Sequence, residues 1–74
     1  MSTNQRPPPN GITPREVQVL LHLARGRSKP QVAKILGISA HTANRHTTNL
    51  MGKAGVHSRA ELVRWAIRNG VMEA

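Results

Sequence analysis

The feature that most constrains the fold is a pattern of hydroxyl residues and glycines that recurs along the chain. A serine or threonine opens each of four segments, and a glycine follows each segment. Serine and threonine are favoured just before the first turn of a helix, and glycine just after the last turn. The starts are Thr13, Ser28, Ser39 and Ser58, and the stops are Gly26, Gly37, Gly55 and Gly70. The sequence therefore predicts four helices with short connections, an all-α fold without strands.

Three of these starts carry a second capping residue, because Glu16, Gln31 and Glu61 follow the hydroxyl residue by three positions. A side chain at that position can accept a hydrogen bond from the backbone of the cap residue. Two of the three acids, Glu16 and Glu61, thus fall in first turns, where the helix dipole favours negative charge. We expect the acids to serve as caps and to leave the surface to cations.

Apolar residues recur at helical spacing in the first, second and fourth segments, as expected for helices that share one core. The inward residues are predicted to be Val19, Leu20, Leu23 and Ala24, with Val17 and Leu21 at the edge; Val32, Ala33, Ile35 and Leu36; and Leu62, Val63, Ala66 and Ile67. The 74 residues suffice for one small domain. Residues 1–11 contain three consecutive prolines and no periodic pattern, which predicts a disordered arm or linker.

The third segment, from Ser39 to Ala54, has two unlike sides. At about 100° per residue, one side carries Ala43, Thr47, Leu50 and Ala54, and the other carries His41, Asn44, Arg45, Thr48, Asn49 and Gly52. The second side has no acid and no large apolar residue, whereas ordinary solvent faces mix Glu with Lys. A helix in the major groove needs such a face, since Arg reads guanine and Asn reads adenine. Arg45 can instead bind phosphate, and Asn44 can simply face solvent.

The charge of the chain points to a polyanionic partner. Eleven Lys and Arg stand against three Glu, for a net charge of +8. Single-stranded nucleic acids are usually stacked on several aromatic rings, and Trp65 is the one aromatic residue here, so we expect a duplex. Lys29, Lys34 and Lys53 are candidates for phosphate contacts, which position a protein without specifying a sequence.

Several classes of protein are not expected. The chain has no cysteine, and its four histidines lack any dependable metal-binding spacing. No nucleophile–base set can be assembled, so we expect neither an enzyme nor a metal or other cofactor. No apolar run approaches the roughly 20 residues that a bilayer requires. The polar, proline-rich start is unlike a signal peptide. We therefore expect a soluble cytoplasmic protein.

A longer pattern combines these signals. It runs through Ile12–Glu16, Ala24–Gly26, Ala33–Ser39, Thr42, His46, Leu50, Lys53–Val56 and Ser58–Leu62. In this order the residues resemble the LuxR-type (GerE/NarL-like) helix-turn-helix domain of bacterial transcription regulators, over nearly all of Ile12 to Val71. The resemblance implies a four-helix domain over residues 12–72, with the disordered arm of residues 1–11 before it. An upstream regulatory domain and a location on the nucleoid also accord with the resemblance.

The resemblance further implies a homodimer that binds double-stranded DNA at paired half-sites, with the third helix in the major groove. It implies base contacts from Asn44, Arg45 and Thr48 and a phosphate contact from Thr42. It also implies a dimer surface on the fourth helix, where we expect Glu61, Arg64, a half-buried Trp65 and Arg68. A helix-turn-helix module that binds protein or RNA is the alternative.

This chain departs from the family at three positions. Asn44 and Thr48 stand where the family often carries Lys or Arg, so we expect a different base sequence to be read. Gly52 replaces a better helix former, at a cost of about 1 kcal/mol relative to alanine.

Overall fold

The computed structural model describes residues 9–73, and the expectation of a disordered arm over residues 1–8 lies outside this range. The elements are a 3₁₀ turn η1 (Pro9–Gly11) and the helices α1 (Pro14–Ala24), α2 (Lys29–Leu36), α3 (Ala40–Ala54) and α4 (Arg59–Arg68). No strand occurs between residues 9 and 73. The all-α, four-helix fold class is confirmed.

The helices begin where the hydroxyl residues predict, because local hydrogen bonds hold each first turn. Thr13 Oγ1 accepts from the Glu16 backbone N–H at 3.1 Å, and Glu16 Oε1 accepts from the Thr13 N–H at 2.9 Å. Ser28 and Gln31 exchange the same pair of bonds, at 3.2 and 2.8 Å. At α3, Ser39 Oγ accepts from the Thr42 N–H at 3.0 Å.

The start of α4 differs in one bond from the predicted capping box. Ser58 Oγ accepts from the Glu61 N–H at 3.1 Å, as expected. Glu61 Oε1 instead accepts from the N–H of His57, one residue before the cap, at 2.7 Å. Glu61 therefore fixes the loop that leads into α4 as well as the first turn.

The turn of the helix-turn-helix unit, α2 and α3, depends on a left-handed residue. Gly37 has φ 69° and ψ 34°, a conformation that glycine adopts without steric cost. The N–H of Ile38 then donates to Ala33 O at 2.9 Å and closes the end of α2. The chain changes direction within Gly37–Ser39, and α3 packs against α2.

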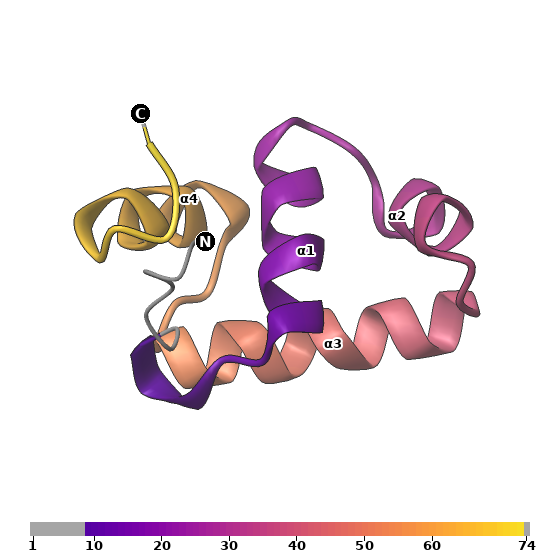
Figure 1. Cartoon of the computed structure of the whole chain (residues 1–74), viewed down its shortest axis with the longest axis horizontal. Helices are drawn as coiled ribbons and strands as arrows, with labels where there is room; N and C mark the ends of the chain where they lie inside the picture. Colours follow the sequence, from indigo (N-terminus) through magenta and orange to yellow (C-terminus); the bar gives the residue numbers. More distant parts are fainter. Residues whose placement is uncertain (1–8, 74) are drawn as a thin grey trace, which may run out of the picture.

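Helix α1 stands at the centre of the molecule. Helices α2 and α4 pack on opposite sides of α1, and α3 runs along one edge beneath them (Figure 1). The largest fully buried side chains are Val19, Leu20, Val32, Leu50 and Leu62, which come from all four helices. All four helices therefore share one core, which holds α3 in place relative to the rest of the domain.

Two residues predicted to face inward are exposed, Ile35 at 52% and Ile67 at 37%. On α4, Trp65 occupies the inward direction and is 6% exposed. Ile67 lies about 160° of helical turn from Trp65, so burying the larger side chain turns Ile67 outward. On the eight-residue α2, Val32, Ala33 and Leu36 face the core, and Ile35 lies outside their arc.

The last three residues of the expected arm have a defined structure. In the turn η1, the Asn10 amide Nδ2 donates to Lys53 O at 3.0 Å. The Lys53 ammonium in turn donates to Gly11 O at 3.1 Å. Ile12, which follows, is 3% exposed. Residues 9–11 are thus fastened to the C-terminal end of α3 rather than being part of a loose arm.

Candidate nucleic-acid interface

The two sides of α3 are confirmed. Ala43 and Leu50 are fully buried and Thr47 is 6% exposed, with its hydroxyl donating to Ala43 O at 2.9 Å. The outward face of α3 comprises the exposed residues His41, Asn44, Arg45, Thr48, Asn49 and Gly52. The buried side chains lie on one side and the exposed polar ones on the other, so the outward face has no structural task in the core.

The first turns of the four helices differ in charge. Acids stand in the first turns of α1 and α4, at Glu16 and Glu61. The first turns of α2 and α3 contain none, because α2 uses the neutral Gln31 as its second cap and α3 has Thr42 at that position. The N-terminus of a helix carries partial positive charge and N–H groups, which attract anions such as phosphate when no acid in the first turn offsets them. The two helices of the helix-turn-helix unit are therefore the ones suited to a phosphate backbone.

The residues expected to contact bases are all exposed on the outward face of α3. Arg45 and Thr48 form no side-chain hydrogen bond or ion pair with any residue from 9 to 73. Asn44 Oδ1 accepts from the Lys29 ammonium at 3.0 Å. The structure thus brings Asn44, Arg45 and Thr48 together on one surface and leaves Arg45 free to reach a ligand.

The residues expected to contact phosphate fall into three situations. Lys34 is exposed on α2 and has no partner within residues 9–73. Lys29 is exposed but is bonded to Asn44. Thr42 is half-buried in the first turn of α3, where its Oγ1 accepts from the Ser39 hydroxyl at 2.9 Å. Of these three residues, Lys34 is thus the one without a side-chain partner in the described range.

Lys53, the fourth residue expected to contact phosphate, has partners inside the fold. Its ammonium lies 2.8 Å from Glu16 Oε1 and 3.1 Å from Gly11 O, and its side chain is 33% exposed. The sequence did not predict this pair, because Glu16 was assigned to capping alone. Glu16 Oε1 in fact accepts from both Thr13 and Lys53. Lys53 therefore joins the end of α3 to the start of α1.

Glu16 is the one buried acid in residues 9–73, at 3% exposure. Burial raises the pKa of its carboxyl. Hydrogen bonds from the Lys53 side chain and from the Thr13 backbone, together with the charge of Lys53, lower that pKa by more than burial raises it. The net result is a pKa below the ordinary value. The carboxylate is therefore ionised at neutral pH and cancels one cation inside the fold.

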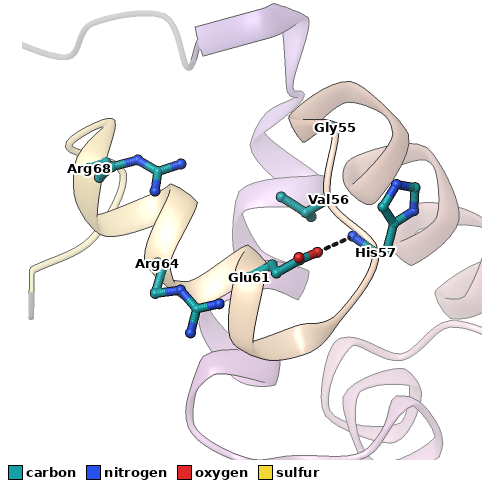
Figure 2. Close-up of a pocket in the computed structure, with 6 residues that line it drawn as sticks. All are labelled: Gly55, Val56, His57, Glu61, Arg64 and Arg68. Carbon is teal, nitrogen blue, oxygen red and sulfur yellow. Dashed lines mark hydrogen bonds between the residues drawn. The ribbon is translucent and has the colours of Figure 1, made fainter.

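The outer side of α4 borders a polar hollow of about 280 Å³ between that helix and the loop before it. Figure 2 shows Glu61 reaching the His57 backbone, with Arg64 and Arg68 projecting from successive turns. Glu61, Arg64 and Arg68 are exposed. Trp65, predicted to be half-buried at a dimer surface, belongs to the core, since the inward face of α4 is centred near Leu62 and includes it.

Neither a metal site nor a membrane-spanning helix is present in the described part of the chain. No group of three or more His, Cys, Asp or Glu side chains within residues 9–73 is placed to hold a metal ion. None of the four helices is both long and apolar enough to span a bilayer.

Sequence reasoning missed two contacts of the candidate residues, Lys29–Asn44 on the outward face and Lys53–Glu16 inside the fold. The partners are 15 and 37 residues apart, so helical periodicity says nothing about them. No local signal singles out Lys29, because Arg15 and Arg59 also stand in first turns and form no side-chain hydrogen bond or ion pair within residues 9–73.

Comparison with known proteins assigns the family. A family model described as "Bacterial regulatory proteins, luxR family" matches residues 10–66. The chain belongs to the LuxR family. LuxR-family domains of this kind bind DNA in regulators of transcription, so the resemblance found in the sequence is confirmed and the chain is not an enzyme.

Individual LuxR-family relatives are longer than this chain. It is 39% identical over 61 residues to the transcriptional regulatory protein MctR of Rhizobium johnstonii, covering 82% of the chain and 28% of that protein. It is 39% identical over 62 residues to the uncharacterized response regulatory protein YgeK of Escherichia coli, covering 84% and 42%. It is 44% identical over 62 residues to the transcriptional activator protein ExaE of Pseudomonas putida, covering 84% and 29%. The chain thus spans less than half the length of these relatives. No solved structure matches it.

Proposed function

We propose that this chain reads a specific sequence in double-stranded DNA, with α3 in the major groove, and acts as a homodimer on paired half-sites. The observation that carries the proposal is the outward face of α3, which holds exposed donors and no acid. A major-groove helix needs such side chains, because base edges offer acceptors to Arg and Asn. The alternatives, a protein-binding or RNA-binding module, gain no comparable support from this face.

Base reading is proposed for Asn44, Arg45 and Thr48. Arg45 lies in the middle of the outward face and is unpaired within residues 9–73, so its guanidinium is free to donate two bonds to guanine O6 and N7. Thr48 lies about one turn further along α3 and is shorter, which suits a contact with a sugar or a thymine methyl.

Positioning on the duplex is proposed for Lys34, Thr42 and the N-terminal turns of α2 and α3. Neither turn contains an acid that would offset the positive end of the helix dipole. Contacts of this kind give most of the affinity and its salt dependence, and none of the sequence preference.

Dimerisation is proposed through the exposed side of α4. Glu61 and the two arginines, Arg64 and Arg68, lie on successive turns and have no ion-pair partner within residues 9–73. A two-fold axis beside α4 would place Glu61 of each subunit opposite an arginine of the other. Each carboxylate and its facing arginine would then have a partner of opposite charge. Trp65 is buried in the core and has no part in this contact.

A regulatory domain upstream of this chain is also proposed. The E. coli relative is named a response regulatory protein, and the matched region is 42% of its length. We therefore propose that an upstream regulatory domain controls this DNA-binding domain, and that the protein works in the cytoplasm on the nucleoid.

The test compares two exposed cations. A preferred site is first selected from random duplexes, and affinities are then measured on that site and on a scrambled duplex at several salt concentrations. Arg45→Ala should cost roughly 1–3 kcal/mol on the selected site and much less on the scrambled one. Lys34→Ala, the matched control, should weaken both duplexes equally and make the salt slope shallower by about one unit per subunit.

Three results would contradict all or part of the proposal. The wild-type dimer should show a log–log salt slope of about −5 to −7, for about 3–4 phosphates per subunit. A slope near zero, or equal competition by duplex RNA, would remove the duplex-DNA function. Equal losses of Arg45→Ala on both duplexes would remove Arg45 as a base-reading residue.

A further inference from the structure

One side-chain hydrogen bond joins the two helices of the helix-turn-helix unit within the described residues. The Lys29 ammonium, in the first turn of α2, donates to Asn44 Oδ1, on the outward face of α3, at 3.0 Å. Both residues are exposed. The bond therefore lies at the surface that the proposed function places against DNA.

The chemistry of this bond sets the direction of the Asn44 amide. A lysine ammonium has three donors and no acceptor, so the amide can turn only its oxygen toward Lys29. The Asn44 Nδ2 group then points away from Lys29 and meets no acceptor within residues 9–73. An asparagine without such a neighbour would present oxygen or nitrogen with similar ease.

The first turn of α2 has no acid to balance Lys29. The first turns of α1 and α4 also hold a cation, Arg15 and Arg59, but each includes a glutamate as well. Because a cation near a helix N-terminus opposes the dipole, Lys29 adds nothing to the stability of α2. The contact with Asn44 gives its ammonium a partner on the neighbouring helix.

We infer that Lys29 is a positioning residue for base recognition, which holds Asn44 with its Nδ2 donors directed into the major groove. This inference rests on the proposed function. Guanine N7 and O6, adenine N7 and thymine O4 are the acceptors available to those donors. Displacement of water on docking lowers the local dielectric and strengthens the Lys29–Asn44 bond when the base is read. Lys29 thus acts through Asn44 and not as a phosphate contact.

The test measures base preference at every position of the half-site. Affinities are determined for duplexes in which each base pair of the selected site is replaced in turn. Lys29→Met keeps the length of the side chain and removes its donors. It should reduce discrimination about three- to tenfold, the range expected for one hydrogen bond. The reduction should fall at one base pair, the pair at which Asn44→Ala also removes discrimination. Lys34→Met, from the same helix, should leave the profile of preferences unchanged.

A double substitution isolates the coupling. In an Asn44→Ala background, Lys29→Met should no longer alter any base preference. A uniform loss on all duplexes, equal in both backgrounds and with a shallower salt slope, would make Lys29 a phosphate contact and overturn the inference while the proposed function stands. If the Asn44→Ala variant discriminates between bases as strongly as the wild type does, the inference about Lys29 is overturned too. A wild type without base preference would instead refute the proposed function, and this inference with it. Thermal unfolding of each variant confirms that it is folded.

Discussion

The pair formed by Glu16 and Lys53 should make a measurable contribution to stability, which Glu16→Gln would expose. Glutamine keeps the shape of the side chain and an oxygen for the Thr13 N–H, but it removes the charge that faces Lys53 at 2.8 Å. A hydrogen bond to a charged group contributes about 1 kcal/mol more than a neutral one. Solvent screens part of this difference, because the Lys53 side chain is 33% exposed. We expect a loss of about 1 kcal/mol, or about 4–8 °C in Tm for a domain of this size.

The pH dependence of this loss identifies its origin. The pKa of Glu16 is lowered in the folded state. The ionised carboxylate therefore stabilises the fold fully above the unfolded pKa, about 4.3 for glutamate, and the contribution disappears as pH falls through the lower folded pKa. Urea unfolding of wild type and Glu16→Gln should show a constant difference above about pH 5 and a shrinking one below.

The control is Glu61→Gln, at the equivalent position of α4. Glu61 is exposed and forms no ion pair within residues 9–73, so the loss on its replacement should be smaller. Equal stabilities of wild type and Glu16→Gln at pH 7 would refute the reasoning. A difference that persists unchanged through the acid range would refute it as well.

Three further predictions concern other parts of the domain. Trp65→Ala should lower the free energy of unfolding by about 3–5 kcal/mol in urea titrations, because Trp65 is 6% exposed in the core. If the variant kept normal stability but lost cooperative DNA binding, Trp65 would instead belong to a dimer interface. Gly37→Ala should cost about 1–2 kcal/mol in the same assay, since φ 69° strains any side chain, and an unchanged stability would contradict that. Arg64→Glu should weaken binding to a duplex with two half-sites more than to one half-site, whereas equal losses would argue against dimerisation through α4.

The starts and ends of the helices could be predicted because their determinants are local. Thr13 and Glu16 are three residues apart, and so are Ser28 and Gln31, and their hydrogen bonds form within one turn. The two sides of α3 follow from its own periodicity in the same way. A reader of the sequence needs no knowledge of the other helices for either feature.

Contacts between elements could not be predicted in this way. The rotation of α4 depends on whether Trp65 or Ile67 fits against α1, which periodicity alone does not decide. The direction of Lys53 depends on Glu16, which approaches only after α1 and α3 have packed. Of the candidate site, the outward face of α3 was therefore foreseen, while the partners of Lys29 and Lys53 were not.

The placement of the acids gives the part of the molecule from Gly11 to Glu73 an uneven charge. From Gly11 to Ser58, seven cations stand against Glu16 alone, whereas from Arg59 onward three cations stand against Glu61 and Glu73. The centre of charge is thus displaced from the centre of mass toward α1, α2 and α3. In the field of any polyanion such a body experiences a torque as well as an attraction. The torque turns α1, α2 and α3 toward the polyanion before contact. This orientation shortens the rotational search and raises the rate of encounter, most strongly at low ionic strength.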